Sequence, residues 1–291
     1  MIDTRHNRHS ALLPLPEEHL PRLKSFLDPI VKQIETPDYI AVDPVAFMYR
    51  FDDNEDRNIT GFLAALLAWG RRNIVMAKVE DLLSRFGTGP ANFIGNLTPI
   101  DEIHLDGFKH RTFTSDDIRW ILRGLSRILR DYGTFENFWA DCYRRSTIYV
   151  ASSRPLLSEF HDRFFRFIPE APKRVRKHIT SPDNNSSCKR LWLYLRWVIR
   201  RNSCVDPGTM RFMSASELMI PLDVHVARYS RLFGLLTRSS NDWKAADELT
   251  TRLRIMDLYD PAKYDYALFG IGIRSIPIPK VLVINHSIRT G

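Results

Sequence analysis

Apolar residues recur every three or four positions along most of this 291-residue chain, a spacing that places them on one face of a helix. Between Leu23 and Ile34 the pattern continues until Pro37 ends it, as expected for a helix. The segment from Ile59 to Trp69 is almost uniformly apolar, which predicts a helix buried on most sides. Further helices are predicted at about 73–86, 115–132, 156–167, 187–201, 223–235, 241–255 and 261–270.

Strand signals are weak. Only the segment from Ile276 to Asn285 has an extended pattern, and Pro277 and Pro279 weaken it. The sequence therefore predicts an all-α protein.

Composition excludes several classes. Hydrophobic residues make up 44% of the chain and charged residues 26%, as in ordinary globular proteins. No apolar run approaches the roughly 18 residues of a membrane span, and the first residues do not resemble a signal peptide. The three cysteines, Cys142, Cys188 and Cys204, have no disulfide-framework or metal-knuckle spacing, which favours a reducing compartment. We expect a cytoplasmic protein with no membrane partner and no bound metal.

The net charge of +8 is concentrated in one segment. Residues 160–201 contain many lysines and arginines and only three acids, Asp162, Glu170 and Asp183. A localised basic segment is typical of phosphate binding, although a solvated helix face gives the same pattern.

Asp223 is one candidate for chemistry. It lies in Pro221-Leu222-Asp223-Val224-His225-Val226, where it precedes a predicted helix. A helix cap explains an acid at this position. A carboxylate fixed at a helix start can also stabilise positive charge that develops nearby. His225 has no second ligand at metal-binding spacing, and we interpret it as structural.

Lys189 is the second candidate. Ser186 or Ser187 is expected to cap the helix that follows, which places Lys189 in its first turns beside Arg190. These surroundings disfavour the charged form of the amine, and an uncharged amine is required for catalysis through a Schiff base. A phosphate-binding or simply exposed lysine remains the alternative. Leu193, Arg196 and Arg200 share a helix face with Lys189.

A lysine-bearing helix followed by the Asp223 element resembles the helix-hairpin-helix DNA glycosylase superfamily. Within it, the gap of 34 residues between Lys189 and Asp223 and an altered hairpin at residues 180–185 are closest to the archaeal 8-oxoguanine glycosylase branch. The chain also resembles a bacterial family of uncharacterised function that carries the Leu67–Gly70, Phe108–Phe113 and Pro221–Val226 motifs. The cysteines of an iron–sulfur cluster are absent, and we expect no cofactor.

The resemblance implies an all-α fold of two helical subdomains with a cleft between them. We expect a flexible arm at residues 1–22, one subdomain from 23–57 plus 203–291, and a central subdomain from 58–202 that carries the lysine helix. The implied partner is duplex DNA with a damaged base, and the implied location is the nucleoid. We expect a monomer with no protein partner.

The implied activity is that of a repair glycosylase with AP lyase activity, in which an oxidised purine is the expected lesion. Lys189 would be the nucleophile and Asp223 would stabilise charge. A non-catalytic DNA- or RNA-binding module, or an unrelated helical adaptor, remains an alternative.

The expected residues that stack on the extruded base are Trp69, Phe108 and Phe113. The expected DNA contacts are Arg71, Arg72, Arg111, Arg174, Lys177 and Arg190.

Overall fold

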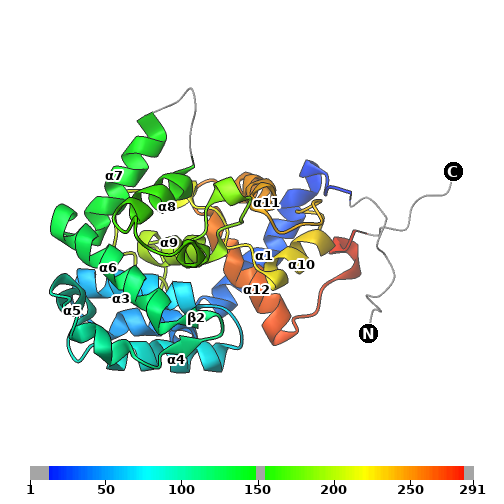
Figure 1. Cartoon of the computed structure of the whole chain (residues 1–291). Coiled ribbons are helices and arrows are strands. Elements are labelled where there is room, and N and C mark those ends of the chain that lie inside the picture. Colours follow the sequence, from blue (N-terminus) through cyan, green and yellow to red (C-terminus); the bar gives the residue numbers. More distant parts are fainter. Residues whose placement is uncertain (1–12, 149–154, 285–291) are drawn as a thin grey trace.

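The computed structural model of the chain describes residues 13–148 and 155–284, and these are mostly helical (Figure 1). The α-helices are α1 (Leu20–Ile34), α2 (Pro37–Ile40), α3 (Asn54–Leu67), α4 (Arg72–Ser84), α5 (Pro90–Gly95), α6 (Ser115–Tyr132), α7 (Phe135–Ile148), α8 (Leu156–Arg166), α9 (Lys189–Ile199), α10 (Val224–Leu232), α11 (Trp243–Met256) and α12 (Tyr264–Arg274). The 3₁₀ helices are η1 (Glu17–His19), η2 (Pro44–Arg50), η3 (Asp101–Leu105), η5 (Lys173–His178), η6 (Pro182–Asn184), η7 (Ala215–Glu217), η8 (Pro261–Lys263) and η9 (Lys280–Leu282). The expected all-α class is confirmed.

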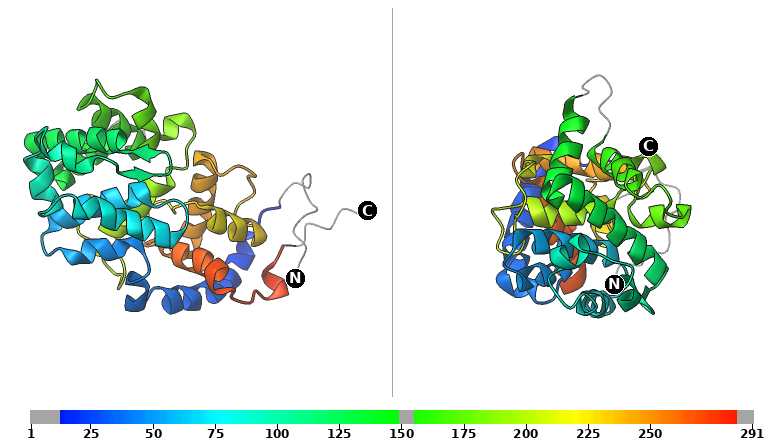
Figure 2. Two further views of the ribbon diagram at one scale, coloured as in Figure 1. Left: turned by 60° about the horizontal axis from the view of Figure 1, so that its bottom comes forward. Right: turned by 60° about the vertical axis from the view of Figure 1, so that its left-hand side comes forward.

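The helices pack in two groups, which Figures 1 and 2 show side by side. In the larger group, α3 packs against η2, α4, α5, α7 and α9. In the smaller group, α12 packs against α1 and α10, and α1 also contacts α11. Helix α9 lies between them, because it packs on α3 while its arginines reach α12.

The interior of the larger group explains why α3 is so apolar. Every residue of α3 from Asn58 to Leu67 is buried, so this helix has no solvent-facing stripe to carry polar side chains. The Phe62 ring lies 5.1 Å from Phe135 and 5.5 Å from Tyr194, in edge-to-face contact with both. The prediction of a helix buried on most sides is confirmed.

Helix α6 has the bounds that its sequence predicts. Thr114 and Asp117 form a capping box at its start, where the Thr114 backbone N–H donates to Asp117 at 2.9 Å. Gly133 ends the helix with a φ of 74°, a conformation that costs glycine nothing.

Three expectations need correction. The subdomain boundary expected at residue 57 falls inside α3, since that helix begins at Asn54. The expected N-terminal arm is helical from Glu17, and Leu15 donates a backbone hydrogen bond to Gly234 at 2.9 Å; residues 1–12 lie outside the described residues. The expected extended segment contains the 3₁₀ helix η9 instead, and its last residue, Asn285, also lies outside them.

Within residues 13–148 and 155–284, the strands are β1 (Lys109–His110) and β2 (Phe113–Thr114), an antiparallel pair. They form a short hairpin whose turn contains Arg111, with a φ of 55°.

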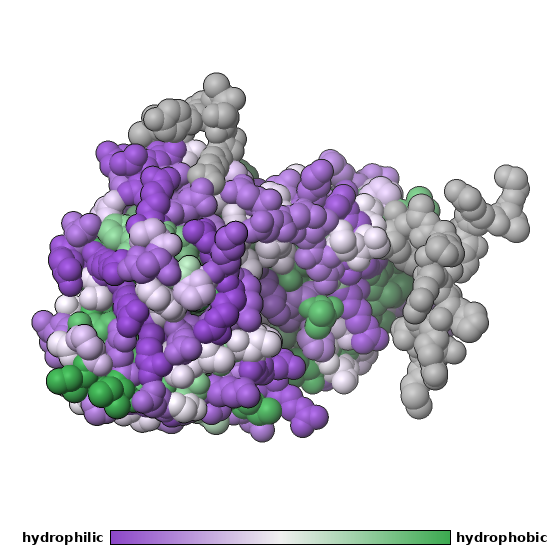
Figure 3. Space-filling model, in the orientation of Figure 1, coloured by the Kyte–Doolittle hydropathy of each residue, from purple (hydrophilic) through white to green (hydrophobic). Residues whose placement is uncertain are grey.

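In the described part of the chain, no helix is long and apolar enough to cross a membrane. The face shown in Figure 3 is mostly hydrophilic over the larger group of helices.

Candidate functional site

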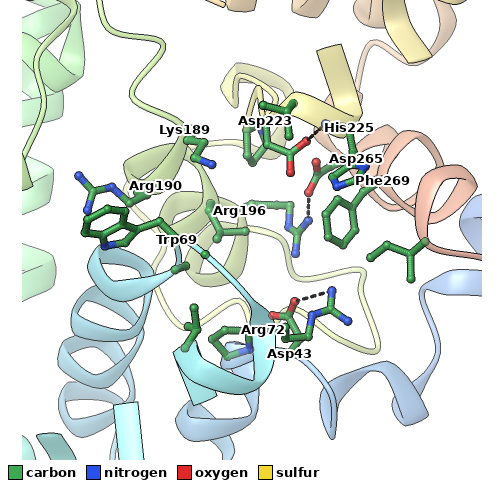
Figure 4. Close-up of a pocket in the computed structure, with 18 of the residues that line it drawn as sticks. Asp43, Trp69, Arg72, Lys189, Arg190, Arg196, Asp223, His225, Asp265 and Phe269 are labelled. Atoms are coloured by element: carbon green, nitrogen blue, oxygen red, sulfur yellow. Dashed lines mark hydrogen bonds and ion pairs between the residues drawn. The ribbon is translucent and has the colours of Figure 1, made fainter. Parts of the chain in front are cut away.

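A pocket of about 500 Å³ opens where the two groups of helices meet, and it contains both candidate catalytic residues (Figure 4). Its wall comes from segments far apart in the sequence: α2, the start of η2, the α3–α4 loop, the first turn of α4, α9 as far as Arg196, the start of α10, and α12. This volume is in the range typical of ligand sites. The pocket combines cationic, anionic and aromatic side chains.

Lys189 is the first residue of α9, and its side chain is directed into the pocket (Figure 4). The residue is half-buried, and within the described residues its amine makes no hydrogen bond or ion pair. The helix is preceded not by a capping serine, as expected, but by Cys188, with a φ of 52°. A buried, non-glycine residue in the left-handed region stores strain, and such strain is typical of functional sites.

Asp223 caps α10 and projects into the same pocket. Its Oδ1 accepts the backbone N–H groups of His225 and Val226, both at 2.8 Å. All of the capping is done by this oxygen, and Oδ2 accepts no hydrogen bond from any described residue. The structural and the chemical interpretation of Asp223 are therefore compatible: one oxygen holds the helix and the other remains available to a ligand.

Beneath these two residues lies a buried ion pair between Arg196 of α9 and Asp265 of α12. Arg196 also lies 3.4 Å from Asp206. Burial raises the pKa of Asp265 to about 7, an effect that Arg196 opposes and that Asp223 increases. Asp265 is therefore a carboxyl group of this pocket whose protonation changes near neutral pH.

Trp69 lies at the pocket edge, in the loop after α3, and is held by the β-hairpin. The Arg111 guanidinium stands 4.9 Å above the Trp69 ring, in cation–π geometry. The His110 Nε2 atom lies 3.2 Å from the Trp69 carbonyl oxygen. A Cβ atom at Gly70, whose φ is 108°, would stand only 2.9 Å from the Arg111 guanidinium. This close approach explains why residue 70 is a glycine.

Arg72 forms another wall of the pocket. Its guanidinium lies 5.4 Å from the rings of both Tyr39 and Phe269, donates to the Tyr39 hydroxyl at 3.2 Å, and lies 3.9 Å from Asp43. We expected Arg72 to contact DNA, and the structure places it inside the pocket instead of on an outer surface.

Two other expected DNA contacts have structural partners. Arg190 donates to the backbone carbonyls of Leu66, at 2.6 Å, and Lys177, at 3.3 Å, and burial lowers its pKa to about 10. Arg174 lies 3.2 Å from the buried carboxylate of Asp117. Arg190 ties α9 to the end of α3, so we do not retain it as a phosphate clamp. Arg174 is exposed, but its charge is already paired.

Phe108 and Phe113 lie outside the pocket, which corrects the expectation that they stack on a base. They are 1% and 0% exposed, respectively. The Phe113 ring lies 3.9 Å from the His178 ring, and the Phe108 ring contacts Lys78 and Arg85. Both rings are core residues that hold the hairpin and η5 against the larger group.

Arg71 and Lys177 are exposed, and no described residue pairs with either side chain. Other cations of the basic segment, residues 160–201, are buried and paired. Arg163, Arg196 and Arg200 are buried in ion pairs with acids, and these acids come from outside the segment. The cations that remain exposed are Arg166, Lys173, Arg174, Arg176, Lys177 and Arg201.

Sequence reasoning did not select Asp43, Arg196, Asp265 or Phe269 as site residues, yet all four line the pocket. One signal was present: Lys189, Leu193 and Arg196 share a helix face, and all three line the wall. Nothing local could have found Asp43 or Asp265, because they meet Arg196 only through tertiary packing.

Among residues 13–148 and 155–284, no group of three or more His, Cys, Asp or Glu side chains has a metal-binding arrangement. The side chains that line the pocket include an amine, carboxylates, guanidinium groups, an imidazole and aromatic rings.

The fold and this pocket define an all-α protein with a charged cavity between two groups of helices. The chain belongs to the family described as a protein of unknown function, DUF2400, whose family model matches residues 43–274. That match includes the pocket residues named above except Tyr39. Neither the curated proteins nor the solved structures contain a match to this chain.

Proposed function

We propose that this protein is a DNA glycosylase that removes a damaged base from duplex DNA and nicks the resulting site through a Schiff base on Lys189. The observation that carries the proposal is the meeting of an unpaired amine, that of Lys189, and a free carboxylate oxygen, Asp223 Oδ2, in one pocket. An amine nucleophile beside a charge-stabilising carboxylate is the arrangement that lysine-based glycosyl transfer requires.

The expected chemistry uses the uncharged amine. Its nitrogen attacks the sugar C1′ atom while the bond from C1′ to the base breaks, and the departing base takes a proton. The sugar ring then opens to give an imine between Lys189 and C1′. Loss of a proton from C2′ expels the 3′ phosphate and cuts the strand. Asp223 Oδ2 stabilises the positive charge that develops on the sugar.

The arrangement of two helical groups around the pocket supports this proposal, because a base must leave the duplex to reach a nucleophile that lies inside a pocket. Trp69 offers an aromatic ring at the pocket edge, and Arg72 offers a cation between two rings. Arg71 and Lys177, exposed and unpaired, are the cations that we assign to the phosphates. We expect an oxidised purine as the lesion.

The test is borohydride trapping of the purified protein on duplexes that contain an abasic site, 8-oxoguanine or no lesion. Borohydride reduces an imine to a stable amine, so a lyase gives a covalent adduct. We expect an adduct that requires a lesion, disappears in Lys189→Gln and persists in the matched control Lys32→Gln, a change at an exposed lysine of α1. An adduct that survives in Lys189→Gln would assign the nucleophile to another amine and overturn this mechanism.

A non-catalytic nucleic-acid module is the second candidate, favoured by the exposed cations of η5, Lys173, Arg176 and Lys177. It predicts salt-dependent binding with neither an adduct nor free base. Measuring base release on the same duplexes separates this function from a glycosylase that lacks the lyase step.

A further inference from the structure

A second cavity, of about 560 Å³, lies at the other end of α9. Lys189 begins this helix and Arg200 follows its end, about 16 Å away at 1.5 Å per residue. The second cavity is lined by residues of α7, the end of α9, the loop before η7 and the turn after α11. None of the proposed catalytic residues lies in it.

The loop that carries Arg211 is fixed to α9. The Gly208 N–H donates to the Trp197 carbonyl at 2.9 Å, and the Met210 N–H donates to the Val198 carbonyl at 2.7 Å. Gly208 has a φ of 58°, and a Cβ atom there would stand 2.6 Å from the Arg200 carbonyl oxygen. This close approach requires glycine, and it holds the segments that carry Arg201 and Arg211 together in a defined wall.

Two cations in this wall are available to a ligand. Arg201 and Arg211 are exposed, and their guanidinium groups have no hydrogen bond or ion pair with any described residue. The acids of the same wall are already occupied. Asp260 pairs with Arg200 at 2.8 Å, and Glu217 accepts from the Tyr143 hydroxyl at 2.6 Å but keeps its charge. Among the described residues, two unpaired cations therefore face one carboxylate without an ion pair, and the net charge of these groups is positive.

Large apolar side chains lie beside these cations. Tyr259 lines the cavity and is 81% exposed, and the preceding Leu258 is 63% exposed. Phe212 also lines the cavity, and its ring stacks parallel to that of Trp139, with centroids 6.1 Å apart. Adjacent exposed apolar residues beside free arginines are typical of protein interaction sites.

We propose that this second cavity binds an acidic peptide segment of a partner protein, in which Asp or Glu residues flank a large apolar side chain. The carboxylates pair with Arg201 and Arg211, whose planar guanidinium groups suit bidentate contacts. The apolar side chain covers Tyr259 and Phe212. A free nucleotide would use the same arginines, but it would leave the Leu258–Tyr259 turn uncovered. This inference does not depend on the glycosylase proposal.

The experiment is selection of a displayed random 12-residue peptide library on the immobilised full chain, followed by fluorescence anisotropy with the enriched peptides. We expect enrichment of sequences that combine acids with Phe, Leu or Trp. The double variant Arg201→Glu/Arg211→Glu should weaken their binding by about tenfold or more, since each attraction becomes a repulsion. Tyr259→Ser should weaken it as well.

The matched control is Arg130→Glu/Lys32→Glu, which makes the same change in net charge at exposed positions on α6 and α1. It should leave binding unchanged within about twofold, and both double variants should keep the wild-type melting temperature. Three results would overturn the proposal: enrichment without acidic residues, equal loss of binding in both double variants, or displacement of the peptide by ATP at concentrations at which ATP itself binds.

Discussion

Arg196 and Asp265 join the two groups of helices through a buried ion pair at the base of the candidate site. Arg196 is 2% exposed, and its guanidinium also lies 4.2 Å from the Tyr266 ring. Removing one partner of a buried pair leaves a charge without compensation, at a cost of about 3–5 kcal/mol. The pocket wall therefore depends on a contact that lies below the proposed chemistry and takes no part in it.

The raised pKa of Asp265 predicts how stability changes with pH. In the unfolded chain this carboxyl titrates near pH 4, and in the folded protein burial raises its pKa to about 7. Between these two values the folded protein keeps a proton that the unfolded chain has lost. The contribution of this carboxyl to stability is therefore full below about pH 4 and is lost as the pH rises to about 7. Asp265→Asn cannot titrate. The free energy of unfolding of the wild type, minus that of Asp265→Asn, should fall between pH 5 and pH 7.

Urea unfolding of both proteins at half-unit pH intervals measures this difference. For a single titrating group, the slope of this free-energy difference against pH cannot exceed about 1.4 kcal/mol per pH unit. Above pH 8 the difference should become constant, since the carboxyl is then ionised in both states. A difference that is flat from pH 5 to pH 8 would show that Asp265 titrates alike in the folded and unfolded chains.

Asp223→Asn separates the two roles of Asp223. Asparagine is a good helix cap, so Oδ1 can still accept the His225 and Val226 N–H groups and the melting temperature should change little. The negative charge is lost, and we expect base release to slow by about 100-fold or more. Single-turnover assays with 8-oxoguanine duplexes measure the rate, and affinity for DNA should stay within about twofold.

Asp223→Ala is the companion variant, because it loses both the cap and the charge. It should lower stability by about 1 kcal/mol in addition to slowing base release. If Asp223→Asn released base at the wild-type rate, the carboxylate would have only the capping role.

The fold was predictable where its signals are local. Helix α6 carries its own start and stop, in Thr114, Asp117 and Gly133, and its predicted bounds match the structure. Helix α7 was not predicted. Its aromatic residues pack on several sides, so it has no clear polar stripe, as Phe135 and Trp139 illustrate.

The site was predictable only in part, for a physical reason. Lys189 and Asp223 each begin a helix, a position that the sequence reveals, and the structure brings both to one pocket. An aromatic residue that stacks on a ligand and one that fills the core have the same local pattern, so Phe113 was wrongly selected. Asp265 was not found because its importance comes from Arg196, 69 positions away in the sequence.

The contact between Arg111 and Trp69 predicts a graded series of variants. Trp69→Ala should weaken lesion-dependent binding by about 1–3 kcal/mol, the usual contribution of an aromatic ring stacked on a base. Trp69→Phe should recover much of this loss. Arg111→Ala should have a smaller effect, because it removes only the cation that holds the ring.

Competition between lesion-containing and undamaged duplexes measures the loss that is specific to the flipped base. Phe108→Ala is the control, since Phe108 is a core ring outside the pocket: it should lower the melting temperature without changing the ratio of the two affinities. If Trp69→Ala reduced both affinities equally, Trp69 would contribute to general binding and not to recognition of the extruded base.

The exposed and the buried cations near α9 should differ in the salt dependence of DNA binding. Arg71 and Lys177 are exposed and unpaired, so replacing either with alanine should reduce the slope of log K against log[salt] by about 0.9, the effect of one lost phosphate contact. Arg190 keeps its charge, but its guanidinium donates to the carbonyls of Leu66 and Lys177 and is therefore not directed at DNA. Arg190→Met should leave the slope unchanged and lower the melting temperature, because the carbonyl at the end of α3, that of Leu66, loses its donor. Titrations from 50 to about 200 mM salt distinguish these outcomes. A reduced slope at full thermal stability in Arg190→Met would instead make Arg190 a phosphate contact that turns outward when DNA binds.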